Sequence, residues 1–267
     1  MSQIIFEKIR QTNQYGSDFW SSRSLAKALD YQDYRNFLGV IVKAKKACKN
    51  SGEVIHNHFG DVTEMVKIGA GAERMVNTIY LSRYACYLII QNSDPDKGVV
   101  ALGQTYFAIQ TRRQEKTDEL IEDNKRVQLR DEIKKHNTSL AKAADNAGVK
   151  NYGKFQNFGY KGLYGGMDAR DIKRNKNLKK SQQILDHMGS EELAANLFRA
   201  TQTDAKLRRE NTKGEDTASI MHYAVGKKVR KTIEDLGGTM PENLPSVDGV
   251  DMAKTRLKKY DKKKIKK

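Results

Sequence analysis

One long stretch of the chain contains none of the residues that usually interrupt a helix. No glycine occurs between Gly103 and Gly148, and no proline occurs between Pro95 and Pro241. Glycine and proline are the least favourable residues in a helix interior. The stretch therefore predicts a helix that reaches Ala147, which would be about 65 Å long at about 1.5 Å per residue if it were continuous.

The second half of this stretch carries a seam at 4-3-4-3-4 spacing, typical of a short coiled-coil-like interface. Its members are Leu129, Ile133, His136, Leu140, Ala143 and Ala147. Leu120 and Val127 are out of phase with the seam, so we expect a break near residues 123–126. Because the seam is short and ends in alanines, packing within the chain is favoured, and a homodimer is the alternative.

The residues before the long helix mix strand and helix patterns. Short strands are expected at Ile4–Ile9 and Phe19-Trp20, and a hairpin at residues 65–68 and 75–81. The connection between these strands, Gly69–Ala72, resembles a phosphate-binding loop only in its glycines. It lacks the GK[ST] motif and is followed by a strand instead of a helix, so it is predicted to be a turn. Helices are expected after the caps Ser21-Ser22, before Asn50-Ser51-Gly52, after Ser82, and from Asp94-Pro95.

The residues after the long helix predict further helices. The long helix is expected to end at residues 144–148, which finish in a glycine. The helix end, this glycine and the segment after it together have the outline of a helix-turn-helix. Asp168 and Ser190 are expected to begin helices, and a last helix is expected over about Ile220–Leu236, ending at Gly237-Gly238. Glu191 and Glu192 are interpreted as favourable partners of a helix dipole.

An aromatic, glycine-rich segment lies between these helices, at Tyr152–Gly166. Aromatic rings beside lysines suit single-stranded nucleic acid, because bases stack on the rings and phosphates meet the charges. The alternative is an aromatic loop that packs beneath the C-terminal helices, because large aromatic side chains usually serve cores. The candidates for stacking are Tyr152, Phe155, Phe158 and Tyr160.

Charge is unevenly distributed along the chain. The formal net charge is +16, of which residues 149–267 contribute +12 and residues 1–110 only +3. Such an excess is typical of proteins that bind polyanions, which predicts contact with DNA, although a solvated basic surface is the alternative. The residues expected to contact phosphates are Lys173, Arg174, Lys179, Lys180, Lys227, Lys228 and Arg230.

The sequence contains no recognisable catalytic signature. His56 and His58 lack further ligands at metal-binding spacing, and Cys48 and Cys86 form no CxxC pair. We therefore expect no enzyme, no metal and no cofactor. A metal-dependent nuclease, built from carboxylates that meet only in three dimensions, is the remaining alternative. No run of about 18 apolar residues or signal peptide is present, so we expect a cytoplasmic protein without a membrane partner.

Several long segments resemble the bacterial DNA-damage-inducible protein D (DinD) family, whose N-terminal half is similar to the BRO-N domain of viral and phage antirepressor-like proteins. They are FWSSRSLAKALDYQDYRNF, LSRYACYLIIQNSDP, GQTYFAIQTRRQE, FQNFGYKGLYGG, ILDHMGSEELAANLFRATQT and VGKKVRKTIEDLGGTMPENLP. The resemblance spans about Phe19 to Pro245. It implies an SOS-associated role near DNA repair, with a RecA-type recombinase filament as a partner. The similarity to BRO-N domains implies DNA binding through the N-terminal part. Most of the excess positive charge, in contrast, lies in the C-terminal part, which predicts the contact surface there.

These observations predict an α+β fold with four parts. They are a small BRO-N-like α/β domain (1–110), a long charged connecting helix (111–148), a mainly helical basic domain (149–245) and a basic tail expected to be disordered (246–267). The predicted function is a non-enzymatic DNA-damage (SOS) response protein that binds DNA or modulates recombinational repair. The alternative is an interaction module that docks on a RecA-type recombinase or a repressor, through residues 193–201 or the long helix, and barely contacts DNA.

Overall fold

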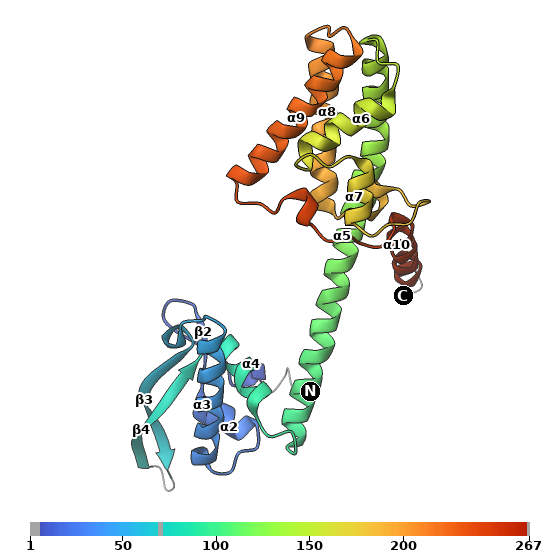
Figure 1. Cartoon of the computed structure of the whole chain (residues 1–267). Coiled ribbons are helices and arrows are strands. Elements are labelled where there is room, and N and C mark those ends of the chain that lie inside the picture. The colour runs from blue at the N-terminus through green and yellow to red at the C-terminus, as the bar shows by residue number, and fades with distance from the viewer. Residues whose placement is uncertain (1–5, 69–71, 266–267) are drawn as a thin grey trace. The chain divides into compact units, whose positions relative to one another are not determined.

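The computed structural model describes residues 6–68 and 72–265. It divides into two compact units, Met1–Gln114 and Glu115–Lys267, and helix α5 (Gly98–Asn146) contributes residues to both (Figure 1). The fold is α+β, as predicted, because a small antiparallel sheet near the N-terminus is followed by helices. No helix among the described residues is long and apolar enough to cross a membrane.

The sheet of the N-terminal unit has four antiparallel strands in the order β1-β2-β4-β3. The predicted hairpin is confirmed and is longer than expected, with Phe59 opposite Leu81 at one end and Ile68 opposite Ala72 at the other. Residues 69–71 of the predicted turn lie outside the described residues. The strands are β1 (Gln11–Thr12), β2 (Asp18–Ser21), β3 (Phe59–Ile68) and β4 (Ala72–Leu81).

The helices of this unit bury their apolar faces in one core with β2 and β4. Short polar side chains cap two of these helices. Ser82, a predicted cap, accepts a hydrogen bond from the Ala85 amide at 3.1 Å, and Asp33 accepts one from the Arg35 amide at 2.8 Å. Trp20 at the centre of the core is fully buried. The helical segments are α2 (Ser22–Ala28), α3 (Tyr34–Asn50), η1 (Ile55–Asn57) and α4 (Arg83–Asn92).

Two local predictions in this unit are wrong. The expected strand Ile4–Ile9 is helical at residues 6–8, and residues 1–5 lie outside the described part of the chain. Asp94 does not cap the long helix, because its side chain accepts from the Asp96 amide at 3.0 Å and its carbonyl accepts from the Lys97 amide at 3.3 Å. These bonds close a turn around Pro95, and α5 begins only at Gly98.

The predicted break in the long helix is also wrong, because α5 continues without interruption from Gly98 to Asn146. The inward-facing positions near residue 123 hold charged side chains instead of apolar ones. Asp123 and Arg126 are each 2% exposed and form an ion pair at 3.6 Å. Arg126 lies in heptad phase with Ile133 and Leu140, so the interface continues with polar contacts.

The C-terminal unit packs shorter helices against the second half of α5 (Figure 1). Much of the predicted seam lies in its two cores, including Ile133, Leu140, Ala143 and Ala147, which confirms packing within the chain. The helix predicted over about Ile220–Leu236 is α9, which begins five residues earlier, at Glu215. The elements are α6 (Tyr152–Leu163), α7 (Ala169–Asn175), η2 (Ile184–His187), α8 (Ser190–Arg209), α9 (Glu215–Asp235), η3 (Pro241–Asn243) and α10 (Val250–Ile265).

The glycine-rich aromatic segment is helix α6, not a loop, and its glycines lie where α6 meets α9. A β-carbon on Gly226 would lie 2.7 Å from the carbonyl oxygen of Gly159, and a β-carbon on Gly162 would collide with the carbonyl oxygen of Tyr223. Only glycine permits such a close approach of two helix backbones, so these residues serve helix packing.

Most of the described part of the basic tail is helical, in contrast to its predicted disorder. Residues 250–265 form α10, whose Val250 is 6% exposed and whose Ala253 is fully buried. A helix of 16 mainly polar residues is marginal alone in water, so its order depends on contacts with the rest of the unit.

Candidate nucleic-acid interface

A shallow groove follows α7 and the segment after it, and it contains Lys173 and Lys180 of the predicted basic set. Asp168 begins α7 with a capping box, as predicted, accepting from the amides of Arg170 and Asp171 at 2.8 and 3.1 Å. The chain then turns at Asn177, which has a φ of 54°. The groove is lined by Tyr160, Ala169, Arg170, Lys173, Lys180, Ser181, Gln182, Gln183, Ile184 and Leu185.

Internal hydrogen bonds hold the segment that forms one wall of this groove. The Lys179 amide donates to the Gln182 side chain at 2.7 Å, and the Lys173 ammonium donates to the Lys180 carbonyl at 2.5 Å. The side chains of Arg170, Lys179 and Lys180 are exposed, and no carboxylate of the described residues lies within ion-pair distance of them. These cations are therefore available to an anionic ligand.

The other predicted phosphate contacts are less uniform. Arg174 is exposed but pairs with Asp171 on its own helix. Lys227 and Lys228 are exposed on α9. Arg230 has a structural role, because it binds Glu242 through two hydrogen bonds of 2.7 Å and its side chain is 26% exposed. The Glu242 carboxylate raises the pKa of Arg230, so this residue is a poor candidate for a phosphate contact.

Two of the four proposed stacking residues are in the core. Phe155 is fully buried against the His222 ring, and Tyr160 is 8% exposed beneath the groove. Neither can present a ring face to a base, so the stacking prediction is wrong for both. Tyr152 is half-buried, with its hydroxyl donating to the Asn137 carbonyl at 3.2 Å, and Phe158 is half-buried. Packing of an amphipathic helix explains the aromatic residues that the sequence presented as a binding loop.

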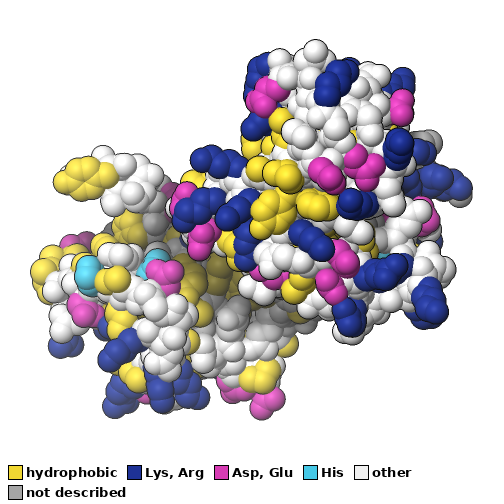
Figure 2. Space-filling model, turned by 45° about the horizontal axis from the view of Figure 1, so that its top comes forward, with side chains coloured by type: hydrophobic (Ala, Val, Ile, Leu, Met, Phe, Trp, Pro, Cys, Tyr) yellow, Lys and Arg dark blue, Asp and Glu magenta, His cyan; other side chains and the backbone are white. Residues whose placement is uncertain are grey.

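Lys and Arg side chains are spread over the visible surface among acidic ones, rather than gathered in one patch (Figure 2). The groove along α7 is therefore distinguished by its concave shape and by its unpaired cations, not by being the only basic region. Among the described residues, no group of three or more His, Cys, Asp or Glu side chains is arranged to hold a metal ion.

The C-terminal unit contains a buried polar network that no sequence motif indicated. Glu192, interpreted as a dipole partner, is fully buried: Lys176 donates to it at 2.8 Å and the Tyr164 hydroxyl at 2.8 Å. Burial raises the pKa of Glu192, against the opposing effect of these two donors. Asn196 extends the network by donating to the Tyr164 hydroxyl at 2.7 Å.

Arg199 is the most unusual member of this interior. It is 2% exposed, its guanidinium contacts Nε2 of His222, and it lies 4.7 Å from the centroid of the Tyr160 ring. The His222 Nδ1 atom lies 3.1 Å from the Phe155 carbonyl, so it carries the proton and Nε2 accepts from Arg199. Burial and the adjacent guanidinium hold the pKa of His222 well below its usual value, which keeps the imidazole neutral.

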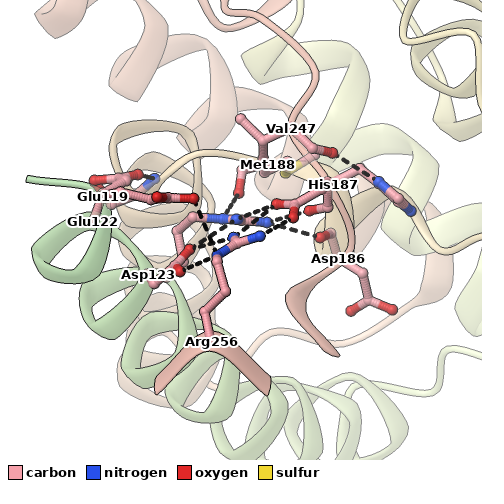
Figure 3. Close-up of polar contacts among 11 residues, drawn as sticks. Glu119, Glu122, Asp123, Asp186, His187, Met188, Val247 and Arg256 are labelled. Carbon is pink, nitrogen blue, oxygen red and sulfur yellow. Dashed lines mark hydrogen bonds and ion pairs between the residues drawn. The ribbon is translucent and has the colours of Figure 1, made fainter. Parts of the chain in front are cut away.

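A second polar cluster attaches α10 to α5, and we call it the α10 clamp (Figure 3). Arg256 extends from α10 to Asp123, binding its two carboxylate oxygens at 2.6 and 2.7 Å, and it also pairs with Asp248. Arg126 bridges the same Asp248 at 3.1 Å and the Met188 carbonyl at 3.1 Å. The two carboxylates raise the pKa of Arg256. The clamp consists of Asp123, Arg126, Asp248 and Arg256.

The N-terminal unit contains a separate apolar pocket beside α4. Arg83 lies at its edge, 4.9 Å from the Trp20 ring, and pairs with Glu7 at 3.0 Å. The pocket is lined mainly by aliphatic and aromatic side chains such as Tyr87, Tyr106 and Phe107. Because Glu7 already neutralises Arg83, this pocket does not attract an anion.

Comparison with known proteins agrees with this architecture. Residues 8–108 match the BRO family, N-terminal domain, and residues 120–252 match the DinD C-terminal domain. The chain is 55% identical over 249 residues to DNA damage-inducible protein D of Escherichia coli (strain K12), an alignment that covers 90% of this chain and 91% of that relative. These matches confirm the resemblance seen in the sequence segments, and the chain belongs to the DNA-damage-inducible protein D (DinD) family, with a BRO-type N-terminal domain.

Proposed function

We propose that this protein acts in the response to DNA damage by binding nucleic acid without catalysing a reaction on it. The groove along α7 supports this proposal best, because Arg170, Lys173 and Lys180 line one concave surface and no carboxylate of the described residues neutralises them. The similar protein from E. coli is named for its induction by DNA damage, which is consistent with a ligand such as DNA.

The physical basis of the proposal is the release of counterions from the phosphate backbone. Each phosphate that a lysine or arginine neutralises lowers the slope of log affinity against log salt by about 0.7 to 0.9. Three cations in one groove therefore predict a slope of about −2 to −3 from this surface alone. Lys179, beside the groove, and Lys227 and Lys228 on α9 would add to the slope if the nucleic acid extends to them.

A charge-matched pair of variants tests the groove. Arg170→Gln, Lys173→Gln and Lys180→Gln are combined in one protein, and the control combines Lys134→Gln, Lys142→Gln and Lys150→Gln, which are exposed residues of α5 and the turn after it. Binding to labelled single-stranded and duplex oligonucleotides is measured over a salt series. The groove variant should lose about 10-fold or more in affinity and 2 to 3 units of slope, and the control should lose little. Equal slopes in all three proteins would refute the proposal.

The absence of catalysis is part of the proposal and has its own test. Purified protein is incubated with single-stranded and duplex DNA in the presence of Mg²⁺ or Mn²⁺, and we expect intact DNA after prolonged incubation. Cleavage that disappears when EDTA is added would instead support the metal-dependent nuclease.

A second candidate function is docking on a protein such as a RecA-type recombinase filament or a repressor. An apolar groove between α8 and α9 favours it: Phe198 on its edge is 52% exposed, and Ala195, Val229, Ile233 and Leu244 line it. Leu193, part of the helical face expected to dock, is buried and unavailable. Phe198→Ser should reduce co-sedimentation with recombinase filaments while leaving binding to bare DNA unchanged. Unchanged co-sedimentation would exclude this surface.

A further inference from the structure

We infer that Arg199 is a fixed positive charge beneath the floor of the α7 groove, and that it adapts this groove to phosphodiester groups. The inference rests on the proposed function and names the ligand chemistry of the same groove. Arg199 itself touches no ligand, because it is buried behind Tyr160, so we assign it as a positioning residue that acts through its electric field.

The first observation is that Arg199 has no acidic partner. Its polar contacts are His222, which is neutral, and the Asn196 side-chain oxygen at 3.3 Å. Its Nε atom has no hydrogen-bond partner, and no carboxylate of the described residues lies within ion-pair distance of its guanidinium. Burial lowers the pKa of Arg199, but an arginine side chain is not deprotonated in proteins, so the guanidinium keeps its charge. The interior therefore retains one positive charge that its neighbours do not neutralise.

The second observation is that the neighbouring charges, one pair buried and one half-buried, already cancel each other. Glu192 is paired with Lys176 at 2.8 Å, and Arg130 is paired with Asp186 at 2.7 Å. Neither carboxylate is available to compensate Arg199. An unpaired buried charge is costly for stability, so its presence calls for a compensating role at the surface that it faces.

The third observation connects this charge to the groove. Tyr160 lies between the two, because it lines the groove and its ring centroid is 4.7 Å from the Arg199 guanidinium carbon. The electric field of a charge in a low-dielectric interior is weakly screened. The positive potential of Arg199 therefore extends to the groove surface that Arg170, Lys173 and Lys180 line. Unlike those flexible side chains, Arg199 is held in place before the ligand arrives.

The geometry of the floor indicates which part of a nucleic acid is bound. Phe155 is fully buried and Tyr160 is 8% exposed, so neither offers a ring face for stacking. The wall instead carries Ser181 and Gln183, whose polar side chains can bond to phosphate oxygens. The groove therefore recognises the phosphodiester backbone rather than the bases.

Two substitutions remove the field in different ways. Arg199→Met deletes the charge with similar volume. Asn196→Asp keeps the arginine and places a carboxylate beside it, and it also removes the amide that donates to the Tyr164 hydroxyl and to the Glu192 carbonyl, so its folding is checked first. Arg199→Lys retains the charge and should bind like the unaltered protein. A unit charge about 10 Å from a phosphate, at an effective dielectric of about 20 and with half of the effect screened, changes affinity about fourfold. We expect a loss of about 4- to 10-fold in each of the first two variants.

The experiment measures binding of a labelled 20-nucleotide DNA strand to the full chain over a salt series, with thermal unfolding as a check of folding. Gln202→Glu is the control, because it adds one negative charge to α8 at an exposed position. It should change affinity less than twofold. The salt slope should stay within half a unit in Arg199→Met and Asn196→Asp, because no phosphate contact is lost.

The outcomes separate this inference from the proposed function. If the groove variant loses binding while folded Asn196→Asp binds normally, the groove stands and the role of Arg199 is refuted. If the groove variant binds normally, the proposed function fails. If Arg199→Met does not fold, Asn196→Asp decides, because it neutralises the charge without opening a cavity. A loss equal to that of Asn196→Asp in Gln202→Glu would also refute the inference, because any added negative charge would then suffice.

Discussion

Replacing Arg256 with methionine should release helix α10 from the C-terminal unit while the rest of the unit stays folded. The side chain of Arg256 is 29% exposed and that of its partner Asp123 is 3% exposed, and the two share hydrogen bonds of 2.6 and 2.7 Å. The variant retains the stem of the side chain and removes these bonds, so the buried carboxylate keeps only Arg126, at 3.6 Å.

The size of the effect follows from this burial. Removing one partner of a fully buried ion pair costs about 3 to 5 kcal/mol. Because Arg256 is partly exposed, we expect about 3 kcal/mol, which corresponds to about a 100-fold shift from attached to detached α10. The apolar contacts of Val250 and Ala253 are small, and a helix of 16 residues is marginal alone. Detached α10 should therefore unfold.

Native-state hydrogen exchange followed by mass spectrometry measures this directly. Amides of residues 250–265 should lose about 100-fold in protection in Arg256→Met, while those of α8 and α9 keep theirs. Lys254→Gln is the matched control on the same helix, because its ion pair with Asp131 is long, at 3.6 Å, and exposed, and is worth about 0 to 1 kcal/mol. Unchanged protection of α10 in Arg256→Met would show that the α10 clamp does not hold this helix.

Three further outcomes are expected. Gly162→Ala should lower the free energy of unfolding by about 1 to 3 kcal/mol in denaturant titrations, because its β-carbon would collide with α9; Gly153→Ala, where space exists, should not, and equal stabilities would refute this packing argument. The depressed pKa of folded His222 predicts stability that is fully present above about pH 6.5 and is lost as pH falls below it; this loss in melting temperature should shrink in His222→Gln, and identical pH profiles would contradict the prediction. An abasic oligonucleotide should bind within about threefold of a normal strand, whereas tenfold weaker binding would show base contacts.

Local chemistry made much of the secondary structure predictable. Asp33, Ser82 and Asp168 begin helices because a short side chain that accepts backbone amides acts within three residues of the cap. The hairpin was visible because alternating residues flank a glycine-containing connection. The candidate groove was partly predictable for the same reason, since Lys173, Lys179 and Lys180 lie close together in the sequence.

Structural features that depend on contacts between residues far apart in the sequence could not be predicted from local patterns. The expected break in α5 is absent. Asp123, at the position of the predicted break, accepts hydrogen bonds from Arg256, which lies 133 positions away in the chain. The same contact, with the burial of Ala253, orders a tail whose composition alone indicates disorder. Composition describes the unfolded chain and says nothing about a buried carboxylate that a distant arginine can reach.

The sequence by itself determined the family, the α+β class, the long helix and the region of excess positive charge, because these follow from local motifs, periodicity and composition. Only the tertiary structure decided which aromatic residues are buried, such as Phe155 and Tyr160, and which charges lie inside, such as Arg199. The helical period shows which residues share a face, but the depth of that face depends on how closely the neighbouring helix approaches. Here the glycine contact between α6 and α9 sets that distance.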